Sequence, residues 1–174
     1  MVATAPLTIR DFLEDVREGT LSGLAPGLGE PVAKRVFSSL QIHFGEPRLH
    51  YEVWPVRKTG RIEVGLHIEG PQEWSREVAV RLASQADDLR SALGSQYELE
   101  DWTASWCRLH TTLPLGRLTE SLAADVAAAT VRLIEAAEPI VRALDLPAPS
   151  ASSKNGRSGM EPRNRSRWGR RRGG

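Results

Sequence analysis

Several residue types that build common active sites are scarce in this chain of 174 residues. Cys107 is the only cysteine, which excludes an intramolecular disulfide and a cysteine-rich zinc site. No run approaches the roughly 18 apolar residues that a membrane span requires, and residues 1–8 lack the basic start and apolar run of a secretory signal. No Gly-rich phosphate loop ending in Gly-Lys-Ser/Thr occurs. We therefore expect a cytoplasmic protein with no membrane segment and no cofactor.

Lysine is also scarce, because only Lys34 and Lys58 precede residue 149. A restriction-type nuclease site needs an acid-x-Lys motif on a strand, so that metal ligands and a cation converge on the scissile phosphate. The predicted strands offer Glu63-Val64-Gly65 and Glu69-Gly70-Pro71 instead. Cys107 and His110 fall on opposite faces of a predicted strand, which argues against a Cys/His nucleophile pair. We predict no catalytic residue.

Arginine, by contrast, is concentrated at the C-terminal end. Residues 149–174 hold eight Lys/Arg and one acid, a net charge of +7, so the other 148 residues carry −6. Arginines spaced by Gly, Ser and Asn can pair with phosphates, and an indole can stack on an exposed base. The predicted nucleic-acid-binding residues are Lys154, Arg157, Arg163, Arg165, Arg167, Trp168, Arg170, Arg171 and Arg172. Two other interpretations of this segment stay open. It could bind an acidic protein partner, or it could be a solvated terminus that binds no partner.

Hydrophobic periodicity predicts an α+β domain. Thr8, with Asp11 three residues later, suits an N-terminal cap for a helix over about 9–18, and a second short helix is expected from Pro31 to Leu40. Alternating residues predict a hairpin of strands near 49–54 and 62–68, and a helical stripe follows over 74–93. The stretch 97–113 suits one long strand, or two pieces joined at Glu100-Asp101, before a last helix over 118–144 that contains Pro139.

The expected fold is a small antiparallel sheet, a hairpin plus a third strand, covered on one face by long helices in the order αα-ββ-α-β-α. Residues 1–146 would form this domain. Residues 147–174 are rich in Pro, Ser, Gly and Arg and lack an apolar stripe, so we expect a disordered basic tail.

The predicted hairpin has one polar face. If the apolar residues of both strands share the buried face, His50 and Glu52 share the other face with Glu63, His67 and Glu69. Imidazoles and carboxylates on adjacent strands can hold a divalent metal that activates water for phosphodiester hydrolysis, and the candidate ligands are His50, Glu52, His67 and Glu69. An ordinary exposed sheet face has the same alternation, so both alternatives stay open.

Two tryptophans and one face of the last helix are candidates for contact with a partner, a ligand or a second copy of the chain. Trp54 and Trp102 are the predicted residues for a partner or ligand contact, either on the sheet face or in a pocket between the sheet and the last helix. The last helix carries a second apolar strip of Val131, Ile134 and Val141. This strip either packs on the first helices or forms a homodimer interface.

Residues 49–144 resemble an uncharacterised bacterial domain family. The resemblance rests on Arg61-Ile62-Glu63-Val64-Gly65-Leu66-His67-Ile68-Glu69, on the helix ending Leu89-Arg90-Ser91-Ala92-Leu93-Gly94, on the stretch from Glu98 to Trp106, and on a helix ending Glu138-Pro139-Ile140. Members of that family occur alone or appended to restriction-endonuclease-like proteins, so the resemblance implies a nucleic-acid-related setting. It carries no catalytic residues.

Together these patterns predict a non-enzymatic accessory or adaptor domain whose basic tail binds DNA or RNA electrostatically. Two alternatives remain from other classes. One is a metal-dependent phosphodiesterase that uses the polar hairpin face, and the other is a small-ligand-binding domain.

Overall fold

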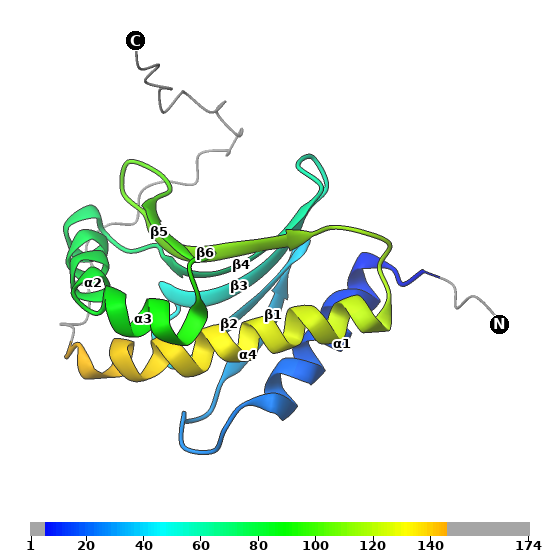
Figure 1. Ribbon diagram of the computed structural model, residues 1–174, viewed down its shortest axis with the longest axis horizontal. Coiled ribbons are helices and arrows are strands. Elements are labelled where there is room, and N and C mark those ends of the chain that lie inside the picture. The colour runs from blue at the N-terminus through cyan, green and yellow to red at the C-terminus, as the bar shows by residue number, and fades with distance from the viewer. Residues whose placement is uncertain (1–5, 146–174) are drawn as a thin grey trace, which may run out of the picture.

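The computed structural model describes residues 6–145 and confirms the α+β class (Figure 1). These residues form four helices and six strands. The helices are α1 (Ile9–Gly23), α2 (Gln72–Ser84), α3 (Ala86–Leu93) and α4 (Glu120–Ala143). The strands are β1 (Val32–Val36), β2 (Ser39–His43), β3 (Leu49–Val56), β4 (Arg61–Ile68), β5 (Glu98–Asp101) and β6 (Cys107–Pro114).

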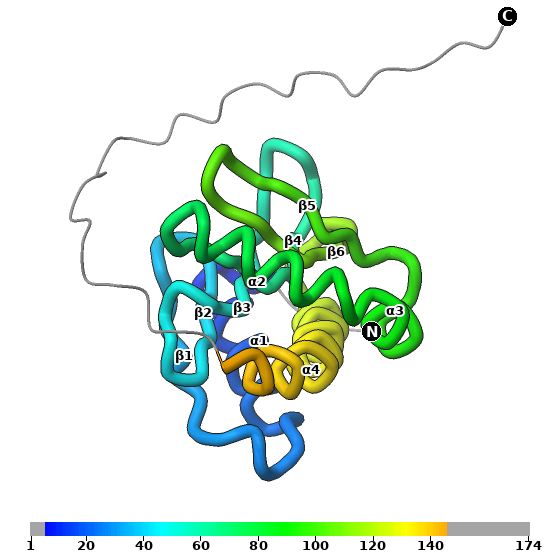
Figure 2. Tube along the Cα trace, turned by 90° about the vertical axis from the view of Figure 1, so that its left-hand side faces the viewer, coloured from blue at the N-terminus to red at the C-terminus, as the bar shows by residue number. Residues whose placement is uncertain are grey.

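All six strands join in one antiparallel sheet in the order β1-β2-β3-β4-β6-β5. The central pair β3 and β4 follows the predicted hairpin, and its register aligns Tyr51 with Leu66 and Val53 with Val64. These apolar residues are buried on one face of the sheet, which α1 and α4 cover (Figures 1 and 2). The core therefore lies between the sheet and these helices, and buried residues of α2 and α3 extend it.

The helices α1 and α4 approach each other closely because two glycines of α1 face α4. A Cβ atom at Gly19 would lie 3.0 Å from the Cβ of Ala127, and one at Gly23 would lie 3.0 Å from Cγ2 of Val131. Ile134 is fully buried as well. Val131 of the second apolar strip thus contacts α1, which agrees with one of the two alternatives predicted for this strip. A homodimer interface through the last helix stays a prediction.

The predicted helix over 31–40 is wrong, because this segment forms the β1–β2 hairpin. The apolar residues whose spacing suggested a helix do not share one buried face. Val32 is 50% exposed and Phe37 is 92% exposed, whereas Leu40 is buried. Phe37 turns the chain with φ of 52°, the left-handed conformation that glycine usually supplies. Without a glycine at this turn, the sequence gives no hairpin signal.

Two further elements differ from the prediction. The helix over 74–93 breaks at Gln85 into α2 and α3. The stretch 97–113 forms two strands, β5 and β6, as one of the two alternatives predicted, but they are joined by a turn over 102–106 and not at Glu100-Asp101. The three-strand sheet and the order αα-ββ-α-β-α are therefore wrong, and the observed order is α-β-β-β-β-α-α-β-β-α. The turn over 102–106 contains no Gly or Pro that would mark it as a turn.

A local hydrogen bond caps the first helix. Thr8 caps α1 as predicted, because its hydroxyl accepts a 3.1 Å hydrogen bond from the Asp11 backbone N–H, although the helix extends to Gly23.

The predicted basic tail, residues 147–174, lies outside the described residues. Among residues 6–145, no helix combines the length and the apolar character needed to cross a bilayer.

Candidate metal centre

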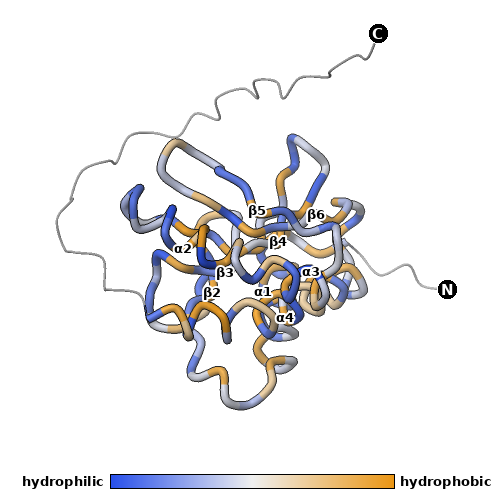
Figure 3. The backbone as a smooth tube through the Cα atoms, turned by 60° about the vertical axis from the view of Figure 1, so that its left-hand side comes forward, coloured by the Kyte–Doolittle hydropathy of each residue, from blue (hydrophilic) through white to orange (hydrophobic). Residues whose placement is uncertain are grey.

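Hydrophilic and hydrophobic residues alternate along the strands of the sheet (Figure 3). The register of the strands places the polar side chains on the face opposite α1 and α4. The register of β3, β4 and β6 aligns His50 with His67 and His67 with Arg108. These side chains are not solvated, since the exposed fraction is 0% for His67 and 3% for His50. The alternative of an ordinary exposed sheet face is therefore wrong.

Trp102, in the turn between β5 and β6, contributes to this burial. Its ring packs edge-on against His67 with 4.9 Å between centroids, and the Arg108 guanidinium lies 5.3 Å from its centroid. Trp54 is aligned with Glu63 on the same sheet face. Both tryptophans thus lie on the side of the sheet away from α4, so the predicted ligand pocket between the sheet and the last helix, lined by Trp54 or Trp102, is wrong.

Four side chains that the sequence singled out converge on one point of this face. One ligand atom each of His50, Glu52, His67 and Glu69 lies within 4.8 Å of the other three. His67 Nδ1 is 3.3 Å from both Glu52 Oε2 and Glu69 Oε1. His50 Nε2 is 3.5 Å from Glu52 Oε2 and 4.0 Å from Glu69 Oε1.

These separations are close to those of a tetrahedral coordination shell. Nitrogen and oxygen ligands of a tetrahedral zinc ion lie about 2.0–2.2 Å from the metal, so neighbouring ligand atoms are roughly 3.3–3.6 Å apart. Of the four separations between an imidazole nitrogen and a carboxylate oxygen, three fall in this range, and the pair of His50 and Glu69, at 4.0 Å, is wider. The two nitrogens and the two oxygens each lie within 4.8 Å of each other. Glu69 follows the end of β4 and its side chain is 23% exposed, the most of the four.

His50 presents an unsatisfied nitrogen to the cluster. Its Nδ1 lies 3.0 Å from the Pro47 carbonyl oxygen, which can only accept, so Nδ1 carries the hydrogen. Its buried Nε2 then faces the carboxylates and has no hydrogen-bond partner among the described residues. A buried nitrogen without a partner costs free energy, typically about 1–3 kcal/mol. A metal ion bound to Nε2 would remove this cost.

His67 is oriented by a carboxylate on its other nitrogen. Its Nε2 donates a 2.8 Å hydrogen bond to Glu63 Oε1, and Glu63 Oε2 in turn accepts a 2.6 Å bond from Arg108. Metal-bound histidines commonly have such a carboxylate partner, which fixes the ring and strengthens the ligand. Burial alone would lower the pKa of His67, but the bonds to Glu63 and Glu69 and the charge of Glu52 raise the pKa to about 9.

Two buried carboxylates of this sheet face, Glu52 and Glu63, are held in the ionised form. Burial alone would raise the pKa of Glu52, but the neighbouring imidazoles His50 and His67 and the Ser39 hydroxyl lower it. Burial acts likewise on the pKa of Glu63, and His67 and Arg108 lower that value. A bound ion would displace the proton on His67 Nδ1, which lies 3.3 Å from Glu69 Oε1. The two ligand carboxylates and the two imidazoles, then neutral, would balance the charge of a divalent ion, so the complete complex would be neutral and suited to a buried place.

Gly65 leaves room for this arrangement in the middle of β4. It is aligned with Glu52 on one side and with His110 on the other. A Cβ atom at this position would lie 2.8 Å from the Cβ of His110 and 3.4 Å from Cδ2 of His67. The missing side chain therefore lets the neighbouring polar groups lie over the strand.

A second group of possible ligands, Glu98, Glu100 and His110, is less well built. Both glutamates are exposed, and His110 Nε2 lies 2.9 Å from Glu100 Oε1. Cys107 lies on the apolar face of β6, and burial together with Asp101 raises the pKa of its thiol to about 11. Cys107 is therefore protonated at neutral pH, which disfavours its use as a nucleophile.

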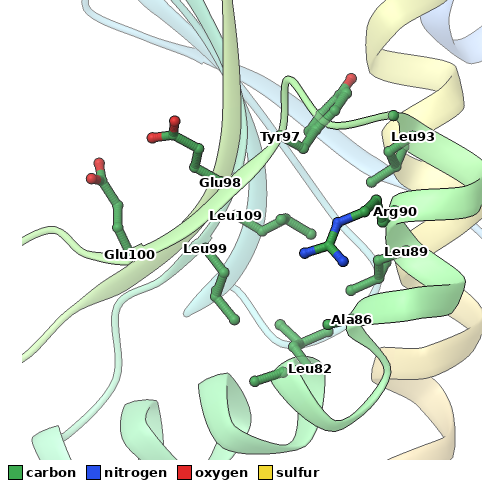
Figure 4. A pocket seen from close by; sticks show the side chains of 12 residues that line it. Leu82, Ala86, Leu89, Arg90, Leu93, Tyr97, Glu98, Leu99, Glu100 and Leu109 are labelled. Atoms are coloured by element: carbon green, nitrogen blue, oxygen red, sulfur yellow. The ribbon is translucent and has the colours of Figure 1, made fainter.

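A cavity of about 480 Å³ lies between α2, α3 and β5 (Figure 4). Leu82, Leu89 and Leu99 point into it, whereas the carboxylates of Glu98 and Glu100 point away. Arg90 is the charged side chain that reaches toward the leucines. The volume suits a small molecule. Five of the twelve lining residues are leucines, so the cavity differs in its chemistry from the polar cluster.

No known protein-family model and no curated protein sequence matches this chain. The resemblance of residues 49–144 to an uncharacterised bacterial family stays a prediction. The predicted tail residues, Lys154 through Arg172, lie outside the described residues.

Sequence reasoning brought the four possible ligands together but missed the groups around them. It placed Glu63 on the same face without a role, and it did not connect Arg108 with this site. Their contribution depends on the alignment of β6 with β4, which the hairpin pattern alone does not reveal. The spacing of Arg108 and His110 in a strand was the available signal.

Proposed function

We propose that this chain is a non-enzymatic metal-binding domain, and that His50, Glu52, His67 and Glu69 hold one divalent ion of the zinc class. The observation that carries the proposal is the buried Nε2 of His50, which faces two carboxylates and a second imidazole without a hydrogen-bond partner. The distances among the four groups and the Glu63 partner of His67 support it.

The donor set favours zinc over magnesium or calcium. Magnesium and calcium take oxygen ligands and retain water or demand six or more donors. Two imidazole nitrogens with two carboxylates suit Zn²⁺, and Co²⁺ can replace it as a spectroscopic probe.

Four protein ligands favour a structural or regulatory role over hydrolysis. Catalytic zinc sites generally keep three protein ligands and leave one position for water, whereas structural sites are filled by the protein. This comparison favours the non-enzymatic prediction over the phosphodiesterase alternative for the same four residues.

Metal titration tests the proposal. Protein freed of metal by chelation is titrated with Co²⁺ and then with Zn²⁺, with Mg²⁺ and Ca²⁺ as comparison ions. We expect visible absorption typical of tetrahedral Co²⁺ at one ion per chain, its loss on addition of Zn²⁺, and no competition from Mg²⁺ or Ca²⁺.

Matched variants locate the site. His50→Ala and Glu69→Gln should each abolish or strongly weaken binding, whereas Glu73→Gln, at an exposed position in the first turn of α2, should bind as the wild type does. Glu69 follows β4 and is partly exposed, so Glu69→Gln keeps the test valid if His50→Ala does not fold. Absence of Co²⁺ absorption in the wild type, or unchanged binding in both site variants, would overturn the proposal.

We propose a second function for the C-terminal segment. Residues 149–174 carry a net charge of +7, whereas the other 148 residues carry a net charge of −6. Arginines in such a segment would bind DNA or RNA phosphates with little sequence preference and strong salt dependence. Such a role fits the nucleic-acid-related setting that the resemblance implies, and a cytoplasmic location. An acidic protein partner is the competing possibility.

Binding of labelled DNA and RNA across a salt series tests this second function. A chain ending at Leu146 should lose most of its affinity and show a flatter salt slope, while its melting temperature stays almost unchanged. Equal affinity of the two chains would rule the proposed role out.

A further inference from the structure

The β5–β6 hairpin is the element that connects the candidate metal centre to the edge of the sheet. β5 has four residues, lies at the end of the sheet and pairs only with β6 among the described strands. Short edge strands open at a lower free energy than central strands, because fewer contacts hold them. The hairpin is thus the part of this sheet face that a bound ion could most readily influence.

A closed ring of contacts joins this hairpin to a proposed metal ligand. His67 bonds to Glu63, and Glu63 bonds to Arg108 of β6. The guanidinium of Arg108 lies over the ring of Trp102, and that ring packs against His67. Each member of the ring therefore holds the next in place around the imidazole.

One outer contact anchors this ring to β5. Arg108 donates hydrogen bonds of 3.0 Å from Nε and 2.7 Å from Nη2 to Glu100 Oε1. If β5 separates from β6, Arg108 loses this carboxylate. Lifting of the turn over 102–106 would also remove the Trp102 ring from His67 and admit water to the ligands.

We propose that metal occupancy of the four-ligand centre clamps the β5–β6 hairpin closed, so that the hairpin and its tryptophans form a metal-controlled surface. This inference rests on the proposed metal function. The open hairpin leaves His67 without its cover and Glu63 without an anchored arginine, so the ion binds the closed form more tightly. A ligand shifts an equilibrium only through such a difference in affinity between two states.

The coupling acts in both directions. Whatever holds the hairpin closed also raises the affinity of the centre for the ion, by the same factor. Trp102 and Trp106, whose ring centroids are 6.0 Å apart and which are both half-buried, lie in the turn that the clamp controls. A partner that contacts this turn would therefore encounter different surfaces with and without metal.

The test compares two carboxylates on the same strand and the same face of the sheet. Glu100→Gln removes the charge that anchors Arg108, whereas Glu98→Gln removes an exposed charge that makes no contact with Arg108 in the structure. We expect the zinc dissociation constant to rise by about tenfold in Glu100→Gln, as for other residues that support metal ligands, and to stay unchanged in Glu98→Gln. Trp102→Ala should weaken zinc binding by a similar factor.

Amide hydrogen exchange provides the second readout. In the wild type, saturating Zn²⁺ should slow exchange over residues 98–107 by about tenfold or more, since the ion stabilises the closed form. The β1–β2 hairpin at the opposite edge serves as the internal control and should respond less. In Glu100→Gln the slowing over 98–107 should be reduced.

The outcomes separate the two proposals. If the wild type binds no metal, the proposed function itself fails. If it binds metal while Glu100→Gln and Glu98→Gln bind zinc equally and exchange over 98–107 is unchanged, the clamp is wrong and the metal centre stands.

Discussion

The Nε2 atom of His67 donates a 2.8 Å hydrogen bond to Glu63 Oε1, and this bond turns Nδ1 of the same ring toward Glu52 and Glu69. The ring nitrogens of His67 thus have separate tasks. One holds the ring in place, and the other faces the three remaining groups of the candidate metal centre.

Replacing Glu63 should therefore weaken metal binding although Glu63 is not a ligand. Glu63→Gln keeps an acceptor for His67 but removes the negative charge, so we expect zinc affinity to fall about 10- to 100-fold. Competition with a chromophoric chelator measures the change. Glu73→Gln, an exposed position in the first turn of α2, is the control. Equal affinity of the two variants would contradict the role assigned to Glu63.

A side chain at Gly65 should disturb the centre of β4. The added Cβ of Gly65→Ala would lie 2.8 Å from the Cβ of His110 and 3.3 Å from the Leu109 carbonyl oxygen, so the strands must shift apart. We expect a loss of about 1–3 kcal/mol in the free energy of unfolding, measured by urea denaturation. At Gly116 the same substitution meets nothing within 4 Å and should change stability by less than about 0.5 kcal/mol.

The apolar side of the sheet contains one buried polar bond that can be tested by itself. Tyr51 donates a 2.9 Å hydrogen bond from its hydroxyl to Glu138 Oε2 of α4. Tyr51→Phe leaves this buried carboxylate oxygen without that donor, which should lower the free energy of unfolding by about 1–3 kcal/mol. Tyr97→Phe is the control, because its hydroxyl reaches only the Ala129 carbonyl at 3.5 Å. Similar losses in both variants would show that the Tyr51 bond contributes little.

Glu138 should also give the protein a characteristic pH dependence. Burial raises the pKa of this carboxyl above its ordinary value of 4.5, against the lowering effect of Tyr51 and Arg142. The unfolded chain therefore ionises Glu138 at lower pH than the folded protein does. The stability contribution is complete below pH 4.5 and is lost as the pH rises through the higher folded value.

Urea denaturation of the wild type and of Glu138→Gln across this pH window checks the sign. The variant cannot ionise at this position, so its stability should decline less as the pH rises. Glu120→Gln, at the start of α4, should follow the wild-type profile. A steeper decline in Glu138→Gln than in the wild type would contradict the assigned direction.

The sequence predicted the parts of the fold where the pattern and the contacts are local. The alternation in residues 49–68 set the register of β3 and β4, and this register brought His50, Glu52 and His67 together. It missed the hairpins at Phe37 and at residues 102–106, because neither turn contains the glycine or proline that normally marks one.

Burial of the polar face was the other feature that local patterns did not determine. Whether His67 is exposed depends on Trp102, which is 35 residues away in the chain and reaches it only when β6 pairs with β4. Long-range pairing of this kind leaves no periodic signal in either segment. The distinction between a solvated strand face and a candidate metal centre therefore required the structure.

The close contact of α1 with α4 has a consequence for biosynthesis. Gly23 belongs to the first helix and Val131 to the last, so a ribosome makes all six strands before the helix that completes the cover over them has emerged. Until then α4 does not cover the apolar face of the sheet, and nascent chains with such exposed apolar surfaces are prone to associate. The protein should therefore acquire its compact form late in translation, and a stall before α4 would leave a species that chaperones recognise.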